Sequence, residues 1–115
     1  MSAEVVDLPL TQGSLFQIRI ALTDDFGNPQ DLTGYGIRGA VKNKYSDESP
    51  LLAFSPVIVD PPTDGLIDVD ILPSASELLP VTEAVYDIEK YLLTDAENVE
   101  KILAGKFLIN PEVTT

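Results

Sequence analysis

The fold of this chain is decided by the stretch from Leu15 to Tyr35, which reads LFQIRIALTDDFGNPQDLTGY. In its first part every second residue is apolar, namely Phe16, Ile18, Ile20 and Leu22. This alternation is typical of a strand that is buried on one face. The second part is rich in Asp, Asn, Gly and Pro, which favour turns for separate backbone reasons. The stretch therefore predicts a strand over 15–23, a polar connection over 24–31 and the approach to a second strand.

Further strands are expected where apolar residues alternate or gather between turn-forming segments. Their ranges are 3–8, 36–43, 51–59, 66–71, 84–94 and 100–110, with turns at 11–14, 44–50, 60–65 and 95–98. Pro56 favours an edge position for its strand, because proline donates no ladder hydrogen bond. Gly36 and Gly39 indicate a bulge or a close backbone approach.

One short helical turn is expected near 74–79. Ser74 and Glu77 have the spacing of a capping box, in which each side chain accepts a hydrogen bond from a free backbone amide. Pro80 then prevents the helix from continuing. Leu78 and Leu79 are expected to close one end of the core.

About seven strands and almost no helix predict an all-β fold, a two-sheet antiparallel sandwich of immunoglobulin-like size. The 115 residues fit one domain, 1–115, that buries a core without a disulfide or a metal. The contacts between the two sheets are expected to come from alternating inward residues. These are Phe16, Ile18, Ile20, Ile37, Val69, Tyr86, Ile88, Leu103 and Phe107.

The charge of the chain restricts its partners. Seven Lys and Arg face nineteen Asp and Glu, which gives a formal net charge of −12. Nucleic acids and anionic membranes both attract basic surfaces, so neither is expected as a partner. No apolar run approaches the ~18 residues that span a bilayer, and residues 1–4 lack the basic start of a secretory signal. Synthesis in the cytoplasm and a positively charged protein partner are expected.

Catalysis is not expected, and neither catalytic nor cofactor-binding residues are assigned. The sequence contains no His and no Cys, which removes the usual general base, thiolate ligands and the activating partner of a nucleophilic Ser. Asp60, Asp64, Asp68 and Asp70 could act as paired carboxylates only if they flanked a cleft. Their pattern instead favours a charged strand face and a loop.

Two groups of residues are candidates for binding. Asp24, Asp25, Asn28 and Asp31 offer oxygen ligands for calcium, but their spacing does not match a twelve-residue calcium loop, and a plain turn uses the same residues. For partner contact, the candidates are a small basic strip that would also neutralise nearby carboxylates and an outward apolar patch. The strip is Arg38, Lys42 and Lys44, and the patch is Tyr91, Leu93 and Leu108.

Four segments resemble a pattern found in small proteins of tailed bacteriophages. Residues 12–38 are similar to a strand followed by "D-x-x-G-x-P-x-D-L-T-G-Y" and a strand that carries Arg. GLIDV at 65–69, VYDIE at 85–89 and LAGKFLINPEVT at 103–114 resemble the later strands and the "P-E-V-T" end of that pattern. The resemblance covers nearly the whole chain and departs at 89–93, where the strand is longer than usual.

The resemblance implies an immunoglobulin-like virion protein of the tail, baseplate or fibre-anchor type. Such a protein would be located in the virion, in several copies around a symmetric assembly, and would dock onto other phage structural proteins that have basic surfaces. A head decoration or neck protein is the alternative within the virion. A carbohydrate-binding or adhesive module is a third hypothesis, based on an exposed Tyr91 and the acidic loops.

Overall fold

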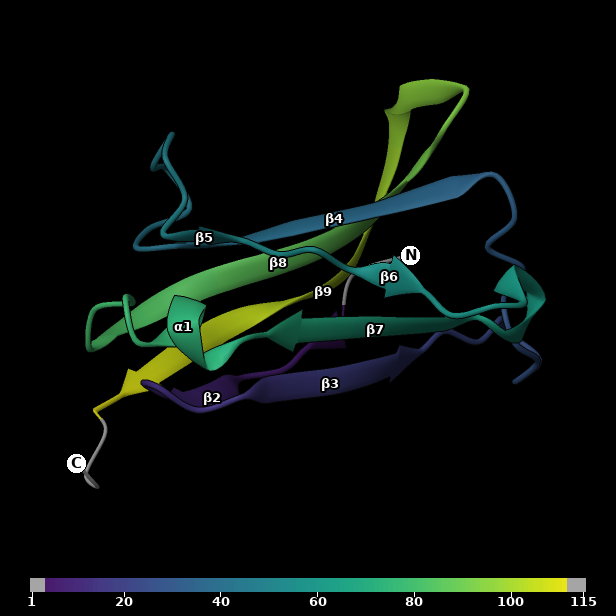
Figure 1. Cartoon of the computed structure of the whole chain (residues 1–115). Helices are drawn as coiled ribbons and strands as arrows, with labels where there is room; N and C mark the ends of the chain where they lie inside the picture. Colours follow the sequence, from purple (N-terminus) through teal and green to yellow (C-terminus); the bar gives the residue numbers. More distant parts are fainter. Residues whose placement is uncertain (1–3, 112–115) are drawn as a thin grey trace.

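The computed structural model describes residues 4–111, which form two packed β-sheets (Figure 1). The larger sheet contains β1 (Glu4–Val5), β2 (Leu8–Thr11), β4 (Tyr35–Lys42), β5 (Leu52–Ala53), β8 (Thr82–Leu92) and β9 (Asp95–Asn110). The smaller sheet contains β3 (Phe16–Ala21), β6 (Val57–Ile58) and β7 (Leu66–Ile71). The helical segments are η1 (Pro62–Asp64) and α1 (Pro73–Ser76). The predicted all-β sandwich is confirmed.

The strand order is β1-β9-β8-β4-β5 in the larger sheet, with β2 also on β9, and β3-β7-β6 in the smaller one. Pairing is antiparallel except that β1 and β2 run parallel to β9. The strand expected at 3–8 is two strands, β1 and β2, and Ala3 lies outside the described residues. The strand expected at 51–59 is also divided, because β5 and β6 belong to different sheets on either side of Pro56.

The break between β1 and β2 is held by three contacts to the larger sheet. The Tyr86 hydroxyl donates to the Val6 carbonyl at 2.6 Å, and the Val6 amide donates to the Ala104 carbonyl at 2.9 Å. The Lys106 amide donates to the Asp7 carboxylate at 3.1 Å. Gly105 leaves room for this approach, since a Cβ there would lie 2.2 Å from the Val6 carbonyl oxygen.

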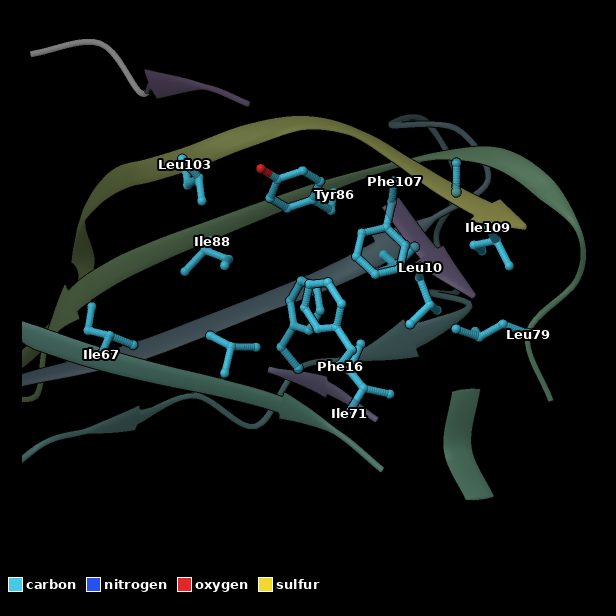
Figure 2. Packing of buried hydrophobic residues seen from close by; sticks show 14 of the residues in the cluster. Leu10, Phe16, Ile67, Ile71, Leu79, Tyr86, Ile88, Leu103, Phe107 and Ile109 are labelled. Carbon is cyan, nitrogen blue, oxygen red and sulfur yellow. The ribbon is translucent and has the colours of Figure 1, made fainter. Parts of the chain in front are cut away.

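The core lies between the sheets around four aromatic rings, and Figure 2 labels Phe16, Tyr86 and Phe107 with their neighbours. Phe107 meets Phe16, Phe54 and Tyr86 edge-on at centroid distances of 5.5, 6.0 and 6.0 Å. All nine predicted core residues belong to this cluster or pack against it, with Ile18, Ile20 and Ile37 only partly buried. The buried residues of this cluster beyond these nine are Leu10, Leu32, Val41, Phe54, Ile67, Ile71, Leu79, Ala84 and Ile109.

The polar connection at 24–31 is a turn, as predicted. The Asp24 carboxylate accepts hydrogen bonds from the amides of Phe26 at 2.9 Å and Asn28 at 3.0 Å. Gly27 has φ +82°, a left-handed value that favours glycine. Leu32, in the motif DLTGY, is 1% exposed and so anchors the end of the connection in the core.

Three local predictions are wrong. No side-chain cap stabilises α1: Leu72, not Ser74, is the N-cap residue, and Pro73 begins the helix. Leu79 is buried as expected, whereas Leu78 is 81% exposed. The turn expected at 95–98 lies at residues 93–94 instead, because β8 and β9 form one long hairpin whose register shifts near its tip.

Candidate interaction surface

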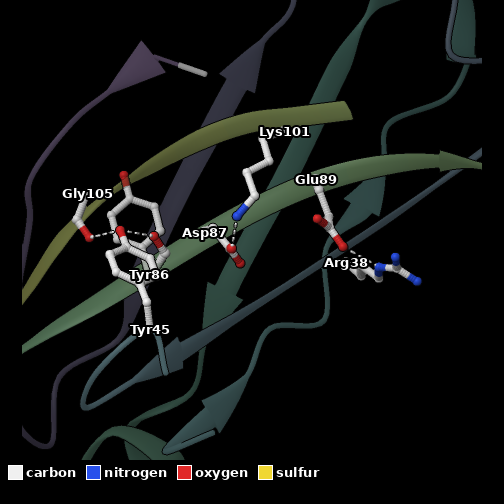
Figure 3. Close-up of polar contacts among 7 residues, drawn as sticks. All are labelled: Arg38, Tyr45, Tyr86, Asp87, Glu89, Lys101 and Gly105. Atoms are coloured by element: carbon white, nitrogen blue, oxygen red, sulfur yellow. Dashed lines mark hydrogen bonds and ion pairs between the residues drawn. The ribbon is translucent and has the colours of Figure 1, made fainter. Parts of the chain in front are cut away.

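The outer face of the larger sheet is crossed by ion pairs between neighbouring strands. Arg38 Nε lies 2.5 Å from Glu89 Oε1, and Lys101 Nζ lies 2.7 Å from Asp87 Oδ2 (Figure 3). Lys106 and Glu83 form a third pair on this face. Lys90 and Glu100 also join β8 to β9, but Lys90 is opposite Ile37 and lies on the inner face. Hydrogen bonds to Asp87 and to Glu83 raise the pKa values of Lys101 and Lys106, respectively. Most of the few cations therefore neutralise carboxylates of the same sheet.

The predicted basic strip does not act as one unit. Arg38 is bound to Glu89, and its guanidinium carbon lies 4.8 Å from the centroid of the Tyr91 ring. The Tyr91 ring covers Gly36, where a Cβ would come within 2.5 Å of it. The expected close backbone approach is confirmed at Gly39, where a Cβ would lie 2.5 Å from the Asp87 carbonyl oxygen. Lys42 and Lys44 lie at the other end of β4, and within residues 4–111 neither has an ion-pair partner.

A shallow depression lies on this face beside Tyr45. Its volume is about 270 Å³, and its lining includes Lys42, Asp87 and Lys101. The Tyr45 hydroxyl is 3.4 Å from the carbonyl oxygens of both Tyr86 and Gly105, which lays the ring along the sheet (Figure 3). Sequence reasoning missed this site, since Tyr45 comes from a polar loop and reaches the sheet only through the fold.

The predicted apolar patch is also divided. Tyr91 is half-buried beneath Arg38. Leu93 is 64% exposed at the tip of the β8–β9 hairpin. Leu108 lies near the other end of the hairpin, opposite Glu83, and lines a groove with Val81. The three side chains therefore do not form one surface.

One end of the sandwich, which we call the acidic end, consists of residues 22–34, 59–65 and 93–99. These segments contain seven acidic residues and no basic residue. Hydrogen bonds join them, from the Leu32 amide to the Pro62 carbonyl at 3.0 Å and from the Leu93 amide to the Gly34 carbonyl at 2.9 Å. The carboxylates of the calcium candidates Asp24 and Asp31 accept hydrogen bonds within their own turns. Across the described part of the chain, no group of three or more Asp or Glu is placed to hold a metal ion.

The opposite end, which we call the α1 end, consists of residues 12–15, 72–82 and 108–111 (left in Figure 1). These segments contain one charged residue, Glu77. Ser76, which is fully buried, donates to the Ser14 carbonyl at 2.8 Å and so joins two of them. Four large apolar side chains are exposed here: Leu15, Leu72, Leu78 and Val81. The pattern of the strands could have revealed Leu15 and Leu72, which adjoin the paired inward residues Phe16 and Ile71 and are therefore out of phase with the core.

An ion pair on the outer face of the smaller sheet leads to a pH-dependent prediction. Arg19 donates two hydrogen bonds to the Asp68 carboxylate, at 2.7 and 2.9 Å, and they lower the pKa of Asp68. A carboxyl whose pKa is lowered by folding contributes stability that is complete above the unfolded pKa of about 3.9 and is lost as the pH falls through the folded pKa. A carbon NMR titration should therefore place the Asp68 midpoint below the ordinary value, and Arg19→Gln should raise it. An equal midpoint in the two proteins would contradict the assignment.

Comparisons with known proteins find similar structures but no similar sequences. No protein-family model matches the chain, and no curated protein sequence matches it. A point variant of the SrpA adhesin from Streptococcus sanguinis is similar in structure, with a TM-score of 0.49 and 11% sequence identity. The alignment covers 96% of this chain and 56% of the adhesin chain. A likeness of this size carries no inference about function.

Among residues 4–111, no helix has the length and apolar character needed to cross a bilayer.

Proposed function

We propose that this chain is a virion structural protein of a tailed bacteriophage, a tail or baseplate module that docks onto neighbouring tail or fibre proteins. The observation that carries the proposal is the resemblance of residues 12–38, 65–69, 85–89 and 103–114 to small phage proteins. Several of these matched residues make contacts that hold the sandwich together. Leu32 is buried, and the Tyr86 hydroxyl donates a hydrogen bond to the Val6 carbonyl. Gly105 leaves room for the chain between β1 and β2.

The distribution of surface charge supports a docking role. The acidic end and the α1 end lie at opposite poles of a molecule whose longest dimension is 44 Å. Contiguous exposed apolar side chains often mark contact with a partner, and a strongly acidic surface attracts a basic one. A rigid sandwich with two chemically different poles can therefore contact two different neighbours at once.

Purification of phage particles through a density gradient, followed by quantitative mass spectrometry, tests this proposal. The expected result is that the protein stays with the particles in a fixed ratio to the other structural proteins. Separated tails and heads distinguish the tail or baseplate role from the head decoration or neck role. Loss of the protein during particle purification would contradict a virion role.

The depression beside Tyr45 favours a second candidate, a carbohydrate-binding module. An aromatic ring next to Asp87 and Lys101 offers stacking and hydrogen bonding together, as sugar sites do. Its volume of about 270 Å³ is close to the lower end of ligand sites, which begin at about 300 Å³. A glycan array with the native chain and Tyr45→Ala tests this role, which requires binding that the substitution removes. No binding by the native chain would exclude it.

A further inference from the structure

We propose that two copies of this chain associate through their α1 ends about a twofold axis. The α1 end exposes Leu15, Leu72, Leu78 and Val81, although the chain elsewhere is strongly acidic. The association is a property of the chain itself and does not depend on the virion role proposed above.

The α1 end has both a projecting side chain and a groove. Leu78 projects from the loop after α1 and is 81% exposed. Nearby, an open groove of about 330 Å³ lies between the start of β8 and the end of β9. Val81, Leu108 and Ile109 form its apolar part, and Thr82, Glu83 and Asn110 form its polar part. A twofold interface places the same patch of each copy against the other, so it requires a projection and a recess on one surface. Leu78 of each copy would enter the groove of the other.

The charge distribution favours this end over every other surface as a contact between copies. Each copy carries a net charge of −12, so association must keep the acidic groups apart. The acidic end carries seven carboxylates, whereas the segments of the α1 end carry only Glu77. Glu83, which borders the groove, is paired with Lys106. The neighbouring loop at 43–51 together with Lys42 adds two positive and two negative charges, which cancel. Contact through the α1 ends separates the two acidic ends by about twice the 44 Å long axis, far beyond the screening length of about 8 Å in physiological salt.

The available area indicates a weak dimer. The two shorter dimensions of the molecule are 28 and 23 Å, which give an elliptical cross-section of about 500 Å² for each copy, or about 1,000 Å² buried in total. This total lies at the lower limit for a specific interface. The dimer should therefore form at high protein concentration, or where a particle holds many copies close together.

Sedimentation velocity from micromolar to millimolar protein tests the proposal, with Leu78→Ser as the variant. Leu93→Ser is the matched control, since Leu93 is an exposed leucine at the acidic end. We expect the native chain to form dimers, Leu78→Ser to raise the dissociation constant at least about tenfold, and Leu93→Ser to leave it unchanged. Both side chains are exposed, so circular dichroism should show that both variants fold.

Small-angle X-ray scattering of the native dimer supplies the geometry. Contact through the α1 ends predicts a maximum dimension of about twice that of the monomer, whereas dimers that form side by side would be little longer than one copy. A chain that stays monomeric at millimolar concentration, an equal effect of the two substitutions, or a dimer no longer than the monomer would each overturn the proposal.

Discussion

Phe107→Ala is expected to lower the free energy of unfolding by about 4 kcal/mol, within the range measured for buried phenylalanines. Phe107 is 0% exposed and meets the rings of Phe16, Phe54 and Tyr86 edge-on. Its removal takes away the transfer free energy of a large side chain, leaves a cavity and ends three aromatic contacts. A single domain is commonly stable by only about 5–15 kcal/mol, so this variant should be close to unfolding.

Urea denaturation followed by circular dichroism measures this effect, and Phe26→Ala is the matched control. Phe26 is the same type of residue but is 89% exposed in the 22–34 connection, so its loss should change stability by less than about 0.5 kcal/mol. If Phe107→Ala does not fold, Phe107→Leu should still show a reduced midpoint. Equal stability of the Phe107 and Phe26 variants would contradict the assignment of the core.

Gly105→Ala is expected to cost about 3 kcal/mol, because the new Cβ has no space. The Cβ would lie 2.2 Å from the Val6 carbonyl oxygen, which Tyr86 holds with a hydrogen bond of 2.6 Å. Relief of this clash requires the backbone between β1 and β2 to move away from β9. The variant should therefore lose the edge of the larger sheet before the rest of the domain unfolds.

Hydrogen exchange detects this release directly. The amide of Val6 donates to the Ala104 carbonyl in the native chain and should exchange much faster in Gly105→Ala. Gly36→Ala is the control, since a Cβ there meets the end of the Tyr91 side chain, which can rotate away. Its cost should stay below about 1 kcal/mol. Unchanged protection of Val6 in Gly105→Ala would show that the clash is relieved in another way.

Most of the fold follows from local sequence patterns. Alternation of apolar residues identified the inward faces of β3, β7, β8 and β9, and the turn chemistry of 24–31 identified the connection after β3. The partners of short strands could not be predicted in the same way, because period-two alternation does not specify the neighbour of a strand. Thus β1 and β2 pair in parallel with β9, although no feature of residues 4–11 distinguishes parallel from antiparallel pairing.

The candidate surface was predicted less well, because it depends on contacts between distant residues. Arg38 was expected to neutralise a nearby carboxylate and does so, but its partner Glu89 is opposite only through the β4–β8 register. Leu78 was expected in the core beside Leu79, yet the turn after α1 directs only one of these two adjacent leucines inward. The contrast between the α1 end and the acidic end appears only when segments far apart in sequence are brought together.

Cryo-electron microscopy of the intact phage particle tests the proposed role most directly. We expect density that fits this sandwich in several symmetry-related copies on the tail or baseplate. Each copy should contact a neighbouring structural protein. Density in the head or neck would assign the alternative position within the virion. A reconstruction in which other proteins account for all of the density would contradict the role as a virion structural protein.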